Sequence, residues 1–262
     1  MFGFIILCVS LVIDNSRSLS LIRFLQAGLL GLAVVLTFNR SFYVMGGLAL
    51  AILACLVRGQ DKRRLLGWSV LAVLLGAVVL ELALVQSVPR ITDLVQGTLA
   101  RFSTLSNRIT LQESSLKSRY IENSYALPQI TSHPIIGLGL RAPYRPWDRW
   151  LDGYRPYELS LYFRTYIHNG HLGVLMTSGW LGYLALVWLS MVFIMRGFKK
   201  WHSIPNARMR AIMLACVLTF VGVPVVAIVN PLYMNSIWIP VLGIMMGTGE
   251  AILRVGQAQS PD

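Results

Sequence analysis

The sequence predicts an all-α polytopic membrane protein with a helix bundle of about seven spans. Of its 262 residues, 55% are hydrophobic and only 13% are charged, and the mean hydropathy is +0.63. This balance excludes a disordered chain and an ordinary soluble domain. Several apolar stretches approach the length of about 20 residues that a bilayer helix needs. Each is expected to be helical, because backbone groups in lipid must be satisfied within the segment.

Seven apolar stretches account for these spans. They cover residues 1–13, 19–38, 41–57, 65–86, 171–195, 211–229 and 236–253. The first stretch ends at Asp14 and is shorter than a crossing requires, so we expect a remnant of a longer helix in an N-terminally truncated or misannotated chain. The rival interpretation is a cleaved signal peptide, but no basic region precedes the stretch and no small-x-small cleavage site follows it.

Basic connectors predict how the spans are oriented. Residues 58–64 carry four positive charges and one negative charge, and residues 196–210 carry five positive charges and no negative charge. Both connectors are therefore expected in the cytoplasm. Alternating the spans from these two anchors places Arg40, residues 88–170 and residues 230–233 outside the membrane, together with the N-terminus. The C-terminus then lies inside.

This topology divides the chain into three parts. Residues 1–87 hold the first four spans, residues 88–170 form a long extracytoplasmic loop expected to carry much of the active site, and residues 171–262 hold the last three spans and a short cytoplasmic tail. Within the loop, residues 105–127 are expected to form a helix whose continuation is limited by Pro128.

Charge and cysteine usage exclude other functional classes. The net charge is +12, but the Lys and Arg residues lie at helix ends, so they indicate topology and not a nucleic-acid partner. Cys8, Cys55 and Cys216 each lie inside an apolar stretch without C-x-x-C spacing. They are expected to be packing residues and not disulfide or metal ligands.

Ionisable residues concentrate on the predicted outer face, which suits an anionic ligand. The members are Arg40, Arg119, His133, Arg141, Arg145, Arg149, Arg155, Arg164, His168 and His171. An arginine offers a planar fork of donors to phosphate and stays charged at any working pH. Alternatives remain for two of them: Arg40 can reach headgroup phosphate from a helix end, and Arg119 can pair with Glu122 one turn later.

His168 precedes Asn169 and Gly170 at the start of the fifth span. A neutral imidazole there can take a proton from a sugar hydroxyl. The alternatives are a histidine that caps or anchors the helix, and a metal site made by His168, His171 and His133. No acidic residue accompanies the two histidines at the span, so no metal is expected.

Aromatic residues of the loop suit a sugar ligand. Trp147 and Trp150 offer flat apolar faces with a polar edge, on which pyranose rings can stack. An interfacial aromatic belt is the alternative, and it accounts less well for these two residues than for Tyr162 and Tyr166 beside the span.

Three stretches of the chain carry a resemblance to a known family. Residues 36–47 (LTFNRSFYVMGG) are similar to its T-x-S-R-small helix junction, with Asn39 in place of the usual Ser. Residues 118–120 (SRY) and 126–139 (ALPQITSHPIIGLG) are similar to its R, then A-L, then hP-h-h-G-x-G signature. Residues 168–182 (HNGHLGVLMTSGWLG) are similar to its HN-x-x-L-x-x-L-x-x-x-G-h-x-G signature. Over about residues 30–195, the chain resembles the bacterial O-antigen ligase and O-antigen polymerase superfamily of polytopic glycosyltransferases.

The resemblance implies a GT-C-like helical fold in the bacterial inner membrane, active on the periplasmic face and without a metal. It assigns Arg40 and Arg119 to the diphosphate of an undecaprenyl-diphosphate-linked glycan, and His168 to activation of the acceptor hydroxyl. Seven further residues on the predicted outer face are expected to contact the glycan or the acceptor glycolipid. They are His133, Arg141, Arg145, Trp147, Trp150, Asn169 and His171.

The sequence therefore supports two hypotheses. The first is a membrane glycosyltransferase, a polymerase or a ligase, that moves a glycan from undecaprenyl diphosphate to a sugar hydroxyl without a cofactor. The second is a non-catalytic or degenerate membrane module that binds or transports a lipid-linked glycan. The sequence separates neither polymerase from ligase nor one oligomeric state from another.

Overall fold

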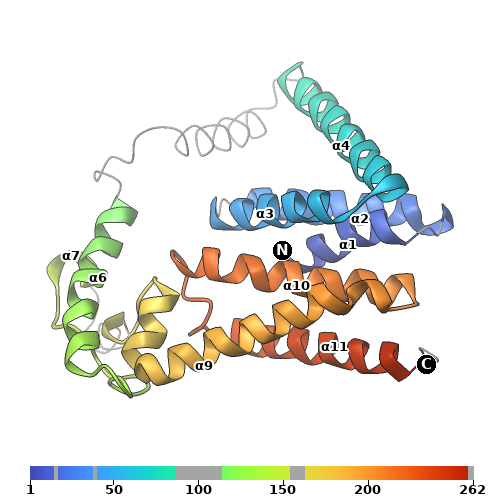
Figure 1. Cartoon of the computed structure of the whole chain (residues 1–262). Helices are drawn as coiled ribbons and strands as arrows, with labels where there is room; N and C mark the ends of the chain where they lie inside the picture. Colours follow the sequence, from blue (N-terminus) through green and yellow to red (C-terminus); the bar gives the residue numbers. More distant parts are fainter. Residues whose placement is uncertain (15–16, 38–39, 86–113, 154–162, 259–262) are drawn as a thin grey trace. The chain divides into compact units, whose positions relative to one another are not determined.

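The computed structural model confirms an all-helical fold across the described residues. The structure describes residues 1–262 apart from 15–16, 38–39, 86–113, 154–162 and 259–262. The helices are α1 (Phe2–Ile13), α2 (Arg17–Leu36), α3 (Arg40–Leu56), α4 (Gly59–Val85), α6 (Ser114–Ser132), α7 (Arg149–Asp152), α9 (Gly170–Lys200), the short 3-10 helix η1 (Trp201–Ser203), α10 (Ala207–Ala227) and α11 (Trp238–Ala258) (Figure 1). Within those ranges no strand occurs.

Each of the seven apolar stretches predicted from the sequence corresponds to one helix. They are α1, α2, α3, α4, α9, α10 and α11. Three described segments are long and apolar enough to cross a membrane: Gly170–Ser203, Ala207–Ala227 and Trp238–Gly256. Shorter apolar helices run over Phe2–Ile13, Leu21–Val34 and Ser41–Leu56. The total of seven spans and the GT-C-like arrangement stay predictions.

The helices form two compact units, each built from separate stretches of chain. The first unit comprises Met1–Arg108, Gly197–Gly222 and Thr248–Asp262, and the second comprises Ile109–Arg196 and Val223–Gly247. In the first unit, α1 packs against α2, α3 and α4. Arg23 of α2 forms an ion pair of 2.8 Å with Asp14, which caps the end of α1. Phe24 of α2 stacks on Trp68 of α4, with ring centroids 4.8 Å apart.

α10 is the most enclosed of the three long apolar helices. Its residues from Ala211 to Leu218 include a run, Met213–Leu218, in which every side chain is fully buried. By contrast, most of the apolar window of α9 and of α11 is not buried, and Trp188 and Ile244 are exposed. A helix that is apolar all round and buried belongs to the interior of a bundle, whereas exposed apolar faces of this length suit lipid.

The loop helix α6 differs from its predicted limits. The prediction that Pro128 limits the helix is wrong, because α6 continues through Pro128 to Ser132. A proline inside a helix removes one hydrogen bond and costs about 3 kcal/mol. Here Ala126 and Ile130, on either side of Pro128, are both buried in the core of the second unit, and this packing holds the helix together. The predicted beginning of this helix, residues 105–113, lies outside the described residues.

A kink divides α9, and the loop at residues 134–139 is hydrogen-bonded to the backbone at the kink. Gly179 has φ 63° and ψ −167°, a conformation essentially confined to glycine. The broken helix leaves amides and carbonyls without intrahelical partners. The loop makes four backbone hydrogen bonds with these groups. In two of them, the amides of Leu138 and Gly139 donate to the carbonyls of Met176 (2.7 Å) and Thr177 (3.0 Å).

The other two bonds run in the opposite direction. The amides of Trp180 and Leu181 donate to the carbonyls of Pro134 (2.8 Å) and Ile135 (3.2 Å). Beyond the kink, the helix from Trp180 to Lys200 is about 31 Å long, close to the thickness of a bilayer's hydrocarbon core. Residues 134–139 (PIIGLG) thus form hydrogen bonds with the backbone groups that the α9 kink leaves without intrahelical partners.

We expect Gly179→Ala to lower the free energy of unfolding by at least about 2 kcal/mol. A Cβ at this position would collide with the carbonyl group of Ile135, and the backbone conformation is strained for any residue with a side chain. Thermal or denaturant unfolding of the purified chain in detergent measures the change. Gly67→Ala is the matched control, because no atom lies within 4 Å of its Cβ position; equal stability of the two variants would contradict the role given to the kink.

Candidate active site

His168 is held by a glutamate from a distant part of the sequence. Its Nδ1 atom lies 2.9 Å from both carboxylate oxygens of Glu122, and its backbone amide donates to Glu122 Oε2 at 2.9 Å. A carboxylate only accepts, so Nδ1 carries the proton of the neutral ring. Nε2 is then left with a lone pair that can accept a proton. The His168 side chain is 39% exposed, whereas that of Glu122 is only 7% exposed.

The packing of α6 explains why Glu122 points at His168. Glu122, Ala126 and Ile130 are spaced by four residues, so they share one face of the helix, and all three are buried. This face packs into a cluster that includes Ile167, the residue before His168. A buried carboxylate needs hydrogen-bond donors. The amide and ring of His168 supply them.

Arg119 does not pair with Glu122. The Glu122 carboxylate is bound by His168, and the described residues provide no hydrogen bond or ion pair to the Arg119 side chain. The sequence alternative of an Arg119–Glu122 pair is therefore not formed. Arg119 is half-buried one turn before Glu122 on α6.

Asn169 and His171 take local structural roles at the start of α9. The Oδ1 atom of Asn169 accepts from the amides of His171 (3.0 Å) and Leu172 (3.1 Å), which makes Asn169 the N-cap of the helix. The Nε2 atom of His171 donates to the carbonyl of Pro224 at 2.8 Å, and its Nδ1 atom lies 3.1 Å from the hydroxyl of Tyr183. A direct contact of either residue with a glycan stays a prediction.

His171 provides a hydrogen-bond donor for the carbonyl of Pro224 near the end of α10. α10 ends at Ala227, so the Pro224 carbonyl is among the last four of the helix and has no intrahelical donor. His171 supplies that donor, and its ring makes edge contacts with Tyr183 and Tyr233. Both ring nitrogens of His171 are thereby engaged.

The histidines do not converge in the described structure. No group of three or more His, Cys, Asp or Glu residues placed to hold a metal ion occurs among the described residues. His133 is exposed at the end of α6, with Nδ1 3.0 Å from Ser132 Oγ. The expectation of a reaction without a metal stays a prediction.

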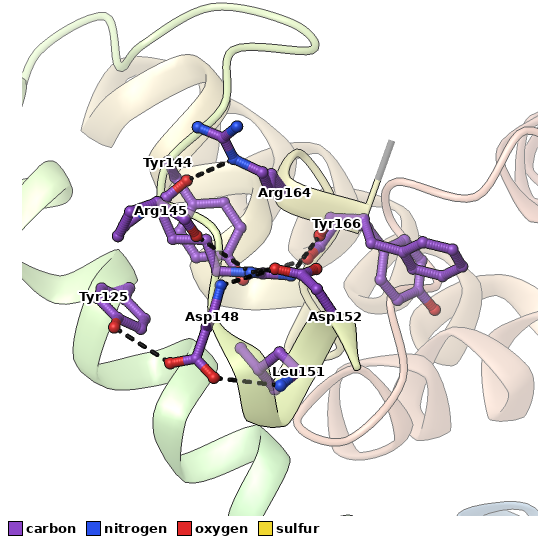
Figure 2. A network of polar contacts seen from close by, with 10 residues as sticks. Tyr125, Tyr144, Arg145, Asp148, Leu151, Asp152, Arg164 and Tyr166 are labelled. Carbon is purple, nitrogen blue, oxygen red and sulfur yellow. Dashed lines mark hydrogen bonds and ion pairs between the residues drawn. The ribbon is translucent and has the colours of Figure 1, made fainter. Parts of the chain in front are cut away.

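Arg145 is enclosed in the loop by an aspartate that the sequence analysis missed. Its two terminal nitrogens bind the two oxygens of Asp152 at 2.8 and 2.9 Å, and both side chains are almost fully buried (Figure 2). Burial acts to lower the pKa of Arg145, but the hydrogen bonds and charge of Asp152 outweigh it, so the pKa is raised. Arg145 therefore stays charged and has a structural role, while a glycan contact remains a prediction.

The same network joins the loop to the segment that leads to His168. Arg164 Nε donates to the Arg145 carbonyl at 2.9 Å, and the hydroxyl of Tyr144 donates to the carbonyl of Tyr166 at 3.2 Å (Figure 2). Burial, followed by the charge of Glu122, raises the pKa of Tyr144, so its hydroxyl keeps its proton. These contacts fix the backbone just before His168. The Tyr166 ring lies edge-on to the His168 ring, with the two ring centroids 5.0 Å apart.

α6 is tied to this network as well. The hydroxyl of Tyr125 donates to Asp148 Oδ2 at 3.2 Å, and Asp148 Oδ1 accepts from the amide of Leu151, which caps the short helix α7 (Figure 2). Tyr125 lies three residues after Glu122. Thus the elements that carry Glu122 and His168 are both bound to one polar network.

The remaining predicted site residues are more scattered. Trp147 is half exposed, and Arg141 is exposed with φ 59°. Arg40 begins α3 in the first unit, but its side chain, like that of Trp150, lies outside the described residues. Arg155 also lies outside them. The structure therefore brings together His168 and Glu122, with Arg119 on the same helix as Glu122, and leaves the placement of Arg40 a prediction.

The sequence matches the model of a known protein family. The family model described as O-antigen ligase matches residues 2–187. This range contains the Arg40, Arg119 and His168 motifs and the loop that fills the α9 kink. No curated protein matches the sequence.

We expect Asp152→Ala to lower the free energy of unfolding by about 3–5 kcal/mol, because it leaves the buried charge of Arg145 without its partner. Arg149→Ala, on the same short helix but exposed, is the matched control and should change stability by no more than about 0.5 kcal/mol. Unfolding of both purified variants measures the difference. A small loss for Asp152→Ala would show that the network does not organise the loop.

Proposed function

We propose that this chain, which belongs to the O-antigen ligase family, transfers a glycan from undecaprenyl diphosphate to a sugar hydroxyl. The family supports a membrane glycosyltransferase of polysaccharide or lipopolysaccharide biosynthesis, acting on a lipid-linked glycan and a glycolipid acceptor. The observation that carries the specific mechanism is the contact of His168 with Glu122. It leaves a partly exposed imidazole whose free nitrogen can act as a base.

In the proposed reaction, His168 Nε2 accepts the proton of the acceptor hydroxyl while the hydroxyl oxygen forms a bond to the anomeric carbon. The bond between that carbon and the diphosphate oxygen breaks, and its electron pair leaves with undecaprenyl diphosphate. A single displacement inverts the configuration of the anomeric carbon. The negatively charged Glu122 stabilises the imidazolium that forms, as the acidic member of a Ser-His-Asp triad does.

Arginine is the side chain suited to the leaving group. The diphosphate gains negative charge as the bond breaks, and a guanidinium placed beside it lowers the barrier. Arg119, free of partners among the described residues and one turn from Glu122, is proposed for this role. Arg40 is proposed as the second diphosphate ligand on its motif alone.

We further propose that the site faces the periplasm and that the chain lies in the bacterial inner membrane. Two packing observations support the predicted alternation of spans. Gly170, at the start of α9, lies against the carbonyl of Asn230, and both are predicted outside. Gly256, near the C-terminus, lies against Ile204 of the 196–210 connector, and both are predicted inside.

We expect His168→Ala to reproduce the surface glycan profile of a deletion strain on a gel, with membrane protein levels matched to wild type. Truncation to a single repeat would indicate a polymerase, whereas accumulation of lipid-linked polymer would indicate a ligase. An altered profile on deletion but not with His168→Ala would contradict the proposed base. If deletion itself changes nothing, the non-catalytic alternative is favoured.

We expect Glu122→Gln to lower kcat roughly 10- to 100-fold with little change in KM, because a neutral amide does not stabilise the charged His168 ring and its NH2 group can favour the other tautomer. Glu122→Asp should recover part of the rate. Initial rates of transfer from a lipid-linked donor, measured between about pH 5 and 9, give both constants and the pH profile. A purely structural role would instead lower stability and the active fraction, with kcat per folded molecule and the pH profile unchanged.

A further inference from the structure

A cavity of about 480 Å³ lies within the first unit, which does not contain His168. Three segments line it. They are the end of α1 at Ile13, residues 55–58 and Asp61 around the turn from α3 to α4, and Trp201, His202 and Arg210 from η1 and α10. The predicted topology places all three segments on the cytoplasmic side.

Part of the cavity lining is basic. Arg58, His202 and Arg210 line it together with one carboxylate, that of Asp61. Asp61 Oδ1 lies 3.6 Å from the guanidinium of Arg64, which offsets part of its charge. The cavity therefore presents two arginines to an anion.

Both arginines have unused donors. The Nε atom of Arg210 is buried and makes no hydrogen bond to the described residues. Arg58 is exposed, and the described part of the chain gives its side chain no ion pair or hydrogen bond. No ion pair among the described residues neutralises either guanidinium, so an anion beside them would be favoured.

Another part of the lining is apolar. Ile13, Leu56 and Val57 line it, together with the buried ring of Trp201. His202 lies over this ring, with the two centroids 3.6 Å apart. A small hydrophilic phosphate would leave these apolar residues unused, whereas a phosphodiester attached to acyl chains would contact both the basic and the apolar residues.

We propose that this cavity binds the phosphate headgroup of an anionic phospholipid from the cytoplasmic leaflet. Arg58 and Arg210 hold the phosphate, and the glycerol and first acyl carbons lie against Leu56 and the apolar part of the lining. Basic pockets among membrane helices on the cytoplasmic side are suited to such headgroups, because anionic lipids give that surface a negative potential. The site is independent of glycan transfer and holds whether or not His168 is the base.

The test measures lipid retention by the purified full chain in detergent, using native mass spectrometry. The probes are dioleoylphosphatidylglycerol, zwitterionic dioleoylphosphatidylcholine, glycerol 3-phosphate and inorganic phosphate. The double variant Arg58→Gln/Arg210→Gln is compared with Arg208→Gln/Arg254→Gln, which removes the same charge from exposed arginines that do not line the cavity. The single variant Arg58→Gln serves if the double variant does not fold, because Arg58 is exposed.

We expect phosphatidylglycerol to bind the wild type and the control variant equally, and the cavity variant roughly 10- to 100-fold more weakly, as for the loss of a charge-assisted contact. Phosphatidylcholine should bind none of them specifically. Equal binding of phosphatidylglycerol by both double variants would overturn the proposal. So would binding of glycerol 3-phosphate or inorganic phosphate that depends on Arg58 and Arg210 in the absence of phosphatidylglycerol binding, which would assign the cavity to a soluble phosphate.

Discussion

The proposed chemistry depends on one contact, that of Glu122 with His168. The carboxylate is buried on the face of α6 that also carries Ala126 and Ile130, so its position is set by core packing. The imidazole is partly exposed, and its ring is oriented by the carboxylate at Nδ1. A rigid acceptor behind a base that meets the substrate fixes both the tautomer and the direction of the free nitrogen.

Two further features hold the elements that make this contact. The loop at residues 134–139 joins the end of α6 to the α9 kink through four backbone hydrogen bonds. The buried pair of Arg145 and Asp152 organises the loop before His168, and Tyr125 links that network to α6. Gly179 and Arg145 therefore act at a distance from the proton transfer, because they fix the positions of His168 and Glu122.

The sequence predicted the helices better than it predicted the contacts of the site residues. Apolar stretches located seven helices, because a helix satisfies all the backbone groups of an apolar segment within that segment. The prediction that Pro128 limits the loop helix was wrong, because the burial of Ala126 and Ile130 outweighs the local effect of proline. Motifs identified His168 and Arg119, but the partners of His168 and Arg145 lie 46 and 7 residues away, and only the folded chain brings them together. The spacing of Glu122 with Ala126 and Ile130 was the one available signal that this carboxylate faces the core.

The protonation of His168 tests the account most directly. Solution or solid-state NMR of the chain with ¹⁵N-labelled histidine, assigned by comparison with the His168→Gln variant, distinguishes the two ring nitrogens. At a pH where the ring is neutral, the account predicts a proton on Nδ1, with a coupling to the Glu122 carboxylate, and a bare Nε2. A proton on Nε2, with Nδ1 bare, would contradict the proposal that His168 is positioned to accept the hydroxyl proton.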